Sequence, residues 1–456
     1  MTTNKGEKIM KASRQKLVGI VALTLSSSLI VPIYSSSAAV IASKSLTKNK
    51  ITLNMYQYES NPGQPEALAS IAKNFTKKYP NITVKIETKA YADYSKTLSL
   101  RARSSNAPDI MEIPQGQVGA VPLSKAGLIQ NLDNYSKLYG WDKKLGGGLA
   151  SNSVTADLKS YGSGTLRAVP LSGQVVGVFY NKKLAAEYGL SVPFASLADF
   201  EAGMAKIKAM GKKDPLIMGS AKYGMHTHNM GVMLGSYTSK ASKIQDWIFG
   251  ASTANINTKE NREALETMQR WTKLGYTNDQ PNALGYEDAV AKFYKGDGVF
   301  FLTGSWLTSG VQKELGDNGG FFLLPRAKSG TPFAGTGSVG TAMGISSKSK
   351  YPNEAAAFID FLAGGNSATI LDGAGWTILA GKSTNAQSVV QKEVIAAFQT
   401  LVKNNSLTYF LDWSTPAMLD KVILPLGQEL IDSKITASLV LQAMQDNWEE
   451  FHLTDK

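Results

Sequence analysis

The sequence predicts a two-lobed α/β protein, in which two sheets flanked by helices are joined where the chain passes between them. Strand and helix patterns alternate from residue 51, and the alternation starts again after residue 181. Between these stretches, the polar break Ser172-Gly173-Gln174 interrupts an apolar run. The chain has 456 residues, 43% of them hydrophobic, which is enough to bury a core in each of two lobes.

The first alternating stretch reads as a β-α-β unit that continues into a further helix and strand. Strands are expected at 51–58, 82–88 and 109–113, where β-branched, aromatic and aliphatic residues gather. Helices are expected at 66–80, which ends at a proline, and at 93–105. This order predicts a mainly parallel sheet covered by helices on both faces.

The second stretch repeats the theme. Helical spacing marks 197–211 and 261–275, and "PLIMGS" between them resembles a strand. A turn at Gly296 to Gly298 then leads into a buried strand that ends in Gly304, Ser305 and Trp306. Extended pieces follow at 319–325 and 335–347, then a helix at 353–364, and the chain from about Ser388 is almost wholly helical.

The polar break has a physical explanation if the chain crosses there from one sheet to the other. At such a crossing, small and polar side chains line a cleft instead of a core. A second crossing is expected within "FFLLPRAKSG", residues 321–330. The predicted lobes are 43–173 with 326–385, and 174–325 with 386–456. Because ligands of such sheets bind beyond the carboxyl ends of the strands, we expect the site in the cleft.

Residues 1–42 have the pattern of a secretory signal peptide. Five basic residues precede an apolar stretch, and small residues follow it, so cleavage is expected after Ala39 or Ala42. The alternative, a retained membrane anchor, fits less well because serines and a proline interrupt a short run. The product is expected in the periplasm or outside the cell. Since the chain has no cysteine, disulfides and a lipid anchor on cysteine are excluded.

Charge and histidine content argue against several kinds of partner. The formal net charge is +12, and the leader contributes five positive and one negative residue, which leaves about +8 for the mature chain. These charges are scattered, and no basic run with interleaved aromatic residues indicates nucleic acid. His226 and His228 have no third ligand nearby in the sequence, so we expect neither a metal site nor a cofactor.

Several segments, in this order and spacing, resemble one protein family. They are "ITLNMYQY", "FTKKYPNITVKIE", "SSNAPDIMEI", "LSKAGLIQNLD", "VFYNKKLAAEYGLSVPFASLADF", "FYKGDGVFFLTGSW" and "NEAAAFIDFLAG". Together they are similar to the extracellular solute-binding proteins of family 1, the carbohydrate-binding subunits of ABC importers. The resemblance implies a periplasmic-binding-protein-like fold of type II, whose lobes close about a hinge on a sugar and deliver it to a membrane permease. It also implies a monomer. The family often has Thr-Trp where this chain has "PFASLADF", which leaves the identity of the sugar open.

Sugars present hydroxyl edges and weakly apolar C–H faces, so their sites combine aromatic platforms with fixed hydrogen-bonding groups. Residues of these types at strand ends, at the crossing and in loops are the candidate ligand contacts: Tyr56, Tyr58, Glu59, Gln115, Gln117, Ser172, Gln174, Tyr223, His228, Trp306, Gly337, Ser338, Trp376, Asp412 and Trp413. Each has a structural alternative. The tyrosines and tryptophans can be packing residues, the glutamines can be solvated, and Glu59 and Asp412 can cap the helices that follow them.

Two rival functions remain open at this point. A glycosidase needs two carboxylates flanking one bond, and Glu59, Glu112 and Asp412 are available, but nothing in their local sequence marks an acid and a base. We therefore expect no catalytic residues. The same fold also takes other solutes, such as a polyamine, a phosphate ester or a peptide. Because the candidate contacts are mostly aromatic and amide, a neutral carbohydrate fits best.

Overall fold

The computed structural model describes residues 41–221, 224, 226–328, 333–379, 386 and 388–453. Residues Ile41 to Lys456 form one compact unit. The expected signal peptide, apart from its last two residues, and the candidate Tyr223 lie outside the described residues. Within the described part of the chain, no helix is both long enough and apolar enough to cross a bilayer.

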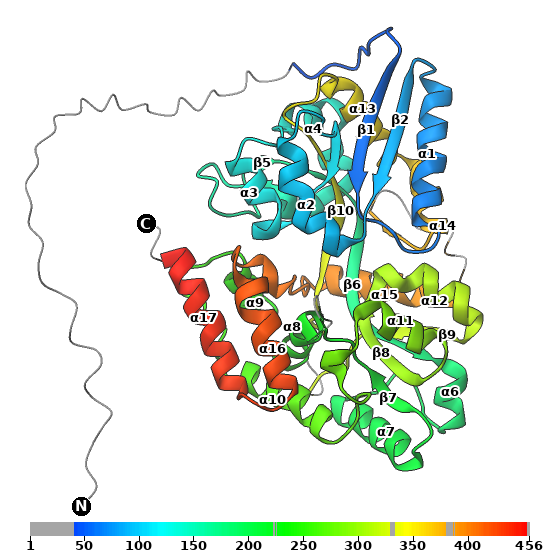
Figure 1. Ribbon diagram of the computed structural model, residues 1–456, viewed down its shortest axis with the longest axis vertical. Coiled ribbons are helices and arrows are strands. Elements are labelled where there is room, and N and C mark those ends of the chain that lie inside the picture. The colour runs from blue at the N-terminus through cyan, green and yellow to red at the C-terminus, as the bar shows by residue number, and fades with distance from the viewer. Residues whose placement is uncertain are drawn as a thin grey trace, which may run out of the picture. The chain divides into compact units, whose positions relative to one another are not determined.

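The first lobe is built on the predicted β-α-β unit (Figure 1). Strand β1 pairs in parallel with β2 and with β3, and helices α1 and α2 lie on opposite sides of these strands. Each element forms within a few residues of its expected range. Their bounds are β1 (Ile51–Gln57), α1 (Gln64–Lys78), β2 (Ile82–Thr88), α2 (Tyr91–Arg103) and β3 (Ile110–Glu112).

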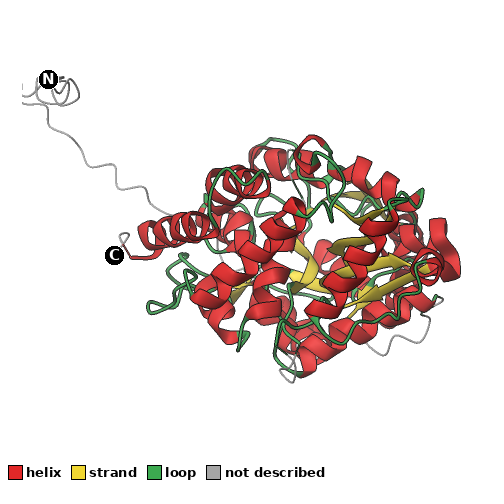
Figure 2. Cartoon of the chain, turned by 90° about the horizontal axis from the view of Figure 1, so that it is seen from below, coloured by secondary structure: helices red, strands yellow, loops and turns green. Residues whose placement is uncertain are grey.

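Shorter elements complete this lobe around the same sheet. They are α3 (Ala120–Lys125), α4 (Asp133–Tyr139), α5 (Trp141–Leu145), β4 (Ser153–Val154), β5 (Thr165–Leu166), β10 (Gly337–Ile345), α13 (Pro352–Leu362), α14 (Gly365–Gly373) and β11 (Thr377–Ile378). Strand β10 runs antiparallel to β3, and β4 pairs with β5 as a separate hairpin. The helices lie outside the strands, as Figure 2 shows.

A single long strand, β6 (Val169–Asn181), joins the two lobes. Its first half pairs with β10 up to Val175 and with β11 at Ser172 and Gly173. From Val176 onward it pairs instead with β8 and β9. The polar break at 172–174 thus lies just before the point where the strand changes partners, as the crossing hypothesis requires.

The second lobe has strands β7 (Asp214–Ile217), β8 (Gly298–Gly304) and β9 (Gly319–Phe322), of which β7 and β8 are parallel. Its helices are α6 (Lys182–Glu187), α7 (Leu197–Met210), α8 (His226–Tyr237), α9 (Ser242–Ile248), α10 (Lys259–Lys273), α11 (Tyr286–Tyr294), α12 (Thr308–Leu315), α15 (Val389–Lys403), α16 (Leu424–Ile431) and α17 (Ala437–Leu453). The last three of these confirm the helical character expected after Ser388.

Two expectations about the sheets and crossings need correction. The sheet order is β2-β1-β3-β10-β6-β8-β7, and β6 is antiparallel to β8, β9, β10 and β11, so the sheet is mixed and not mainly parallel. The reason is that the connecting strands run back and forth between the lobes. The lobe limits given above stay a prediction.

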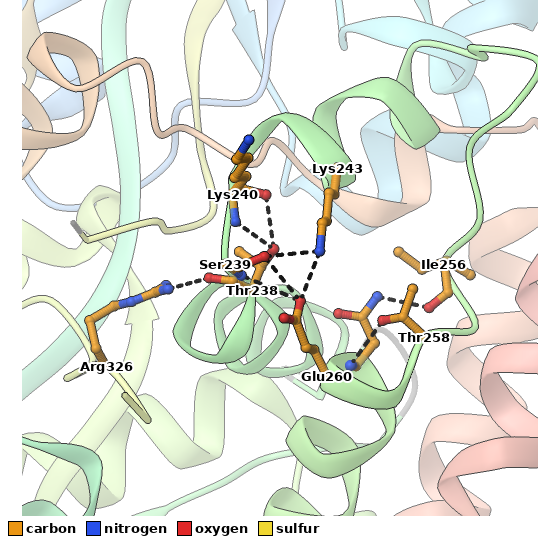
Figure 3. Close-up of polar contacts among 9 residues, drawn as sticks. Thr238, Ser239, Lys240, Lys243, Ile256, Thr258, Glu260 and Arg326 are labelled. Carbon is orange, nitrogen blue, oxygen red and sulfur yellow. Dashed lines mark hydrogen bonds and ion pairs between the residues drawn. The ribbon is translucent and has the colours of Figure 1, made fainter. Parts of the chain in front are cut away.

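The second crossing lies later than 321–330. The backbone N–H of Ala327 donates to Ser236 O at 3.1 Å, and the buried Arg326 guanidinium donates to the carbonyl oxygens of Gly235 and Thr238. These carbonyls end helix α8, so the segment is still held in the second lobe (Figure 3). The change of partners comes at Thr336, whose carbonyl accepts from Val176 N at 2.8 Å. The two crossings therefore lie side by side.

Candidate ligand-binding cleft

A pocket of about 200 Å³ lies where the two lobes and β6 meet. Its lining comes from three parts of the chain: Glu59, Gln64, Gly375, Trp376 and Thr377 from the first lobe, Gly173 and Gln174 from the crossing, and Ser305 and Trp306 from the second lobe. Four of the predicted candidates, Glu59, Gln174, Trp306 and Trp376, thus converge, although they span more than 300 residues of sequence. Only about 10 Å³ of this space admits a water molecule, far less than the roughly 300 Å³ typical of ligand sites, so the cleft is nearly closed.

On the first-lobe side, Glu59 follows β1 and points to the crossing. Its carboxylate accepts a hydrogen bond of 2.8 Å from Thr341 Oγ1 in β10. Burial raises the pKa of Glu59, while hydrogen bonds from Thr341 and others act in the opposite direction. Helix α1 has Gly63 at its N-cap without a side-chain capping bond, so the alternative that Glu59 caps this helix is wrong.

Side chains of the crossing form a polar floor. Ser172 Oγ donates to Thr341 Oγ1 at 2.8 Å, and Ser338 Oγ donates to Gln174 Oε1 at 3.3 Å. Ser338 lies opposite Gln174 in the ladder, and Gly337 lies opposite Val175. Gly173 has no side chain because a Cβ there would come within 2.2 Å of the Phe398 ring.

On the second-lobe side, Trp306 follows the buried strand β8, as expected. Its indole nitrogen donates to Tyr286 Oη at 2.6 Å, and Ser305 Oγ accepts from the backbone N–H of Val175 at 3.1 Å. The indole lies directly over Gly304, where a Cβ would come within 2.0 Å of the ring. These contacts place the half-buried indole at the pocket.

A row of aromatic rings extends from Trp306 along the second lobe. The ring centroid of His228 lies 5.1 Å from Trp306 and 5.5 Å from Phe410, and Phe410 lies 5.0 Å from Trp413. Burial lowers the pKa of His228 to about 4, so this ring is neutral at physiological pH. The row continues to Tyr161 of the first lobe, 6.5 Å from Trp413, and on to Phe249 at 5.1 Å from Tyr161. The lobes therefore touch at the end of this row.

Asp412 lies beside this row in a short 3₁₀ turn, Leu411–Trp413. Burial raises its pKa to about 7. The helical segment that follows begins after Ala417 and has no side-chain cap, so the alternative that Asp412 caps it is wrong. A carboxyl group buried among aromatic rings is a strong hydrogen-bonding group for a ligand hydroxyl.

Four other candidates lie in internal packing of the first lobe. The ring of Tyr56 stacks on Tyr94 of α2 at 4.4 Å, and Tyr58 meets the same ring edge-on at 5.1 Å. The amide of Gln115 donates to Asn152 Oδ1 at 3.1 Å and to the carbonyl oxygen of Val339. Gln117 Nε2 donates to Lys159 O at 2.7 Å.

Sequence reasoning missed several residues of the cleft: Gln64, Thr341, Tyr286, Thr377 and Phe410. Phe410 could have been predicted from the sequence, because it lies two residues before the candidate Asp412. Thr341 is marked only by the structure, where its backbone φ of 47° is rare for a β-branched residue. Among the described residues, no group of three or more His, Asp or Glu side chains is arranged to hold a metal ion.

The sequence was compared with protein families and with known proteins. Residues 59–364 match the family of bacterial extracellular solute-binding proteins. The multiple sugar-binding protein of Streptococcus mutans is 26% identical over 319 residues, which are 69% of this chain and 71% of that protein. The family and the similar structures are binding proteins.

Two solved structures share the fold. A chitin oligosaccharide binding protein is 19% identical with a TM-score of 0.74, covering 88% of this chain and 99% of its own. The solute-binding protein RafE in complex with raffinose is 18% identical with a TM-score of 0.70, covering 88% of this chain and 100% of its own. Both share the two-lobed α/β architecture described above. Since the family match covers more than half of the sequence, this chain belongs to the bacterial extracellular solute-binding proteins.

Proposed function

We propose that this protein is the substrate-binding subunit of an ABC importer, which captures a sugar or oligosaccharide in the cleft and delivers it to the membrane permease. The single observation that carries the proposal is the composition of the pocket. Trp306 and Trp376 offer apolar faces, and Glu59, Gln64 and Gln174 offer fixed hydrogen-bonding groups beside them. This combination suits a ring with C–H faces and a hydroxyl edge.

The comparisons support the same class of ligand. The S. mutans relative is named a multiple sugar-binding protein, and the similar structures include proteins that bind chitin oligosaccharide and raffinose. Among the described residues that line the pocket there is no lysine or arginine, which disfavours a phosphate ester. It contains one carboxylate, whereas a polyamine would require several.

Binding would follow a hinge equilibrium. The pocket has room for little more than one water molecule, about 10 Å³, and the lobes also touch away from it, where Ser160 Oγ donates to Phe249 O at 3.2 Å. A sugar therefore enters an open form, and tighter binding to the closed form shifts the population toward it. The closed lobes then present one surface to the permease. We propose that the protein acts as an exported monomer and catalyses no reaction.

Thermal unfolding in the presence of candidate ligands tests this proposal. Maltose, raffinose, chitobiose, xylobiose and galactose represent the sugars, and putrescine and glucose 6-phosphate represent the rival solutes. A bound ligand raises the melting temperature by mass action, so we expect at least one sugar to stabilise the protein and the rival solutes to leave it unchanged. Stabilisation by putrescine or glucose 6-phosphate alone would contradict the proposal, and release of monosaccharide from an oligosaccharide would indicate a glycosidase.

A further inference from the structure

We propose that Glu112 is a positioning residue for Glu59: the two buried carboxyl groups share one proton, which fixes a single negative charge at the pocket and excludes acidic sugars. This inference rests on the proposed function, because it names the class of sugar that the same pocket accepts. Glu112 does not line the pocket, whereas Glu59 does. Glu112 therefore acts through Glu59.

The fold brings the two carboxyl groups to one place. Glu59 follows strand β1, and Glu112 ends strand β3. These strands are parallel neighbours, with Tyr56 opposite Met111, so their carboxyl ends meet at the same edge of the sheet. Both side chains are buried, Glu59 with 3% and Glu112 with 0% of its surface exposed.

The hydrogen bonds around the pair leave one oxygen without a donor. Thr341 Oγ1 donates to Glu59 Oε1 at 2.8 Å, and the backbone N–H of Tyr58 donates to Glu112 Oε2 at 3.0 Å. Glu112 Oε1 is buried without a hydrogen bond of normal geometry among the described residues, and the side chains that approach the Glu112 carboxyl group are the Glu59 carboxyl group and the Tyr58 hydroxyl. Two ionised carboxylates offer acceptors only, so neither can satisfy the other. A proton between them supplies the missing donor.

The charges around the pair favour the same arrangement. Among the described residues, no lysine, arginine or histidine forms an ion pair with Glu59 or Glu112, and the titratable side chains that face the pair are Tyr58 and Tyr94. Burying two negative charges without a cation is costly. Burial and then the charge of Glu59 raise the pKa of Glu112 well above its usual range, and burial raises that of Glu59. The pair therefore holds one proton and one negative charge, and Glu59 presents that charge to the pocket because it is the member of the pair that lines it.

This arrangement has a consequence for the ligand. An ionised Glu59, held by Thr341 on one side and by the protonated Glu112 on the other, has oxygen lone pairs left for ligand hydroxyl groups. A sugar that carries a carboxylate would bring a second negative charge into a nearly closed pocket whose described lining has no lysine, arginine or histidine. At short range in such surroundings, like charges repel by enough to weaken binding at least about tenfold.

Infrared spectroscopy of the ligand-free protein tests the shared proton. The Asp412→Asn background removes a second carboxyl group that burial keeps partly protonated at neutral pH, since the pKa of Asp412 is about 7. At pH 7 we expect a carbonyl band of a protonated, buried carboxyl group in Asp412→Asn and its loss in Asp412→Asn with Glu112→Gln. Because glutamine has nearly the shape of glutamic acid and its amide still donates to Glu59, circular dichroism is expected to show an unchanged fold. A band that survives Glu112→Gln overturns the shared proton.

Paired sugars test the exclusion of acidic ligands. Galactose against galacturonate, and glucose against glucuronate, differ by one carboxylate, and calorimetry compares their affinities for the wild-type protein and for Glu59→Gln. We expect each acid to bind at least about tenfold more weakly than its neutral partner to the wild type, and the gap to narrow in Glu59→Gln. Equal affinities in the wild type overturn the inference and leave the proposed function intact. A band lost as expected in a protein that binds no sugar overturns the proposed function and leaves the shared proton.

Discussion

The indole nitrogen of Trp306 donates a 2.6 Å hydrogen bond to the hydroxyl oxygen of Tyr286, which itself lies 3.4 Å from Thr303 Oγ1. Tyr286 opens helix α11 and is part of the packed second lobe, so the bond fixes the edge of the indole and leaves its face at the pocket. The indole that we propose as the sugar platform is thus held in place by the second lobe in the absence of ligand.

Replacing Trp306 by alanine is expected to weaken sugar binding by at least about tenfold without unfolding the protein, because the indole supplies stacking area but is only half-buried. Calorimetry with the best sugar of the panel measures the loss. The matched control is Tyr286→Phe, which removes only the hydrogen bond and is expected to cost less. Unchanged affinity in Trp306→Ala would remove this residue from the site.

Gly304 offers an independent test of the indole position. An alanine there would place its Cβ within 2.0 Å of the Trp306 ring, so the ring must move. We expect Gly304→Ala to weaken sugar binding nearly as much as Trp306→Ala, although it removes no atom. Gly365→Ala is the control, since nothing lies within 4 Å of its Cβ, and it should bind as the wild type does. Equal binding by both variants would contradict the assigned indole position.

Arg326 is expected to stabilise the second lobe rather than the ligand. It is 6% exposed, and its loss in Arg326→Met would leave the carbonyl oxygens of Gly235 and Thr238 buried without a donor. We expect the free energy of unfolding in urea to fall by about 2–3 kcal/mol. Arg270, which pairs with Glu201 at an exposed site, is the control, and Arg270→Met should cost about 1 kcal/mol or less. Similar losses in the two variants would contradict this role.

The raised pKa of Asp412 should make the free energy of unfolding depend on pH. Its pKa is about 7 in the folded protein, raised by burial, and near 4 in an unfolded chain. Its contribution to stability is therefore fully present below pH 4 and is lost as the pH rises from 4 to 7. Relative to the wild type, Asp412→Asn should gain up to about 4 kcal/mol on going from pH 4 to pH 8, measured by urea unfolding. An equal difference at both pH values would show that Asp412 titrates normally.

Much of the architecture follows from local pattern. The alternation of β-branched runs with helical spacing predicted the bounds of β1, α1, β2, α2 and β3 to within a few residues. Each of these elements depends on a periodicity of apolar side chains that is visible in its own stretch of sequence. The position of the crossing at 172–174 also followed, since a glycine between polar residues packs poorly in a core, although strand β6 itself runs through it without interruption.

Strand direction and the second crossing did not follow, because both depend on tertiary contacts. Arg326 keeps its segment in the second lobe by donating to carbonyl oxygens at the end of helix α8, about 90 residues earlier in the chain. No feature of the sequence around Arg326 predicts this contact. In the same way, residue type alone does not show whether a face meets a helix or a cleft. Tyr56 and Tyr58 do share a face, as the period of two requires, but helix α2 covers it.

The site itself was predicted in part. Trp306, Trp376, Glu59 and Gln174 all line the pocket, since strand ends and the crossing are identifiable from sequence. Thr341 and Tyr286 were missed because their importance lies in contacts with Glu59, 282 residues away, and with Trp306. The role of Glu112 likewise depends on the pairing of β1 with β3.

The two adjacent crossings, which are hydrogen-bonded to each other at Val176 and Thr336, restrict how one lobe can move relative to the other. A single connecting strand would leave the lobes free to twist as well as to swing apart, whereas two strands bonded to each other favour rotation about one axis along the pocket floor. Residues far from that axis travel the longest arc. If the proposed opening occurs, a pair of spectroscopic labels near Ser160 and Phe249, which are hydrogen-bonded here, would register it as an increase in their separation.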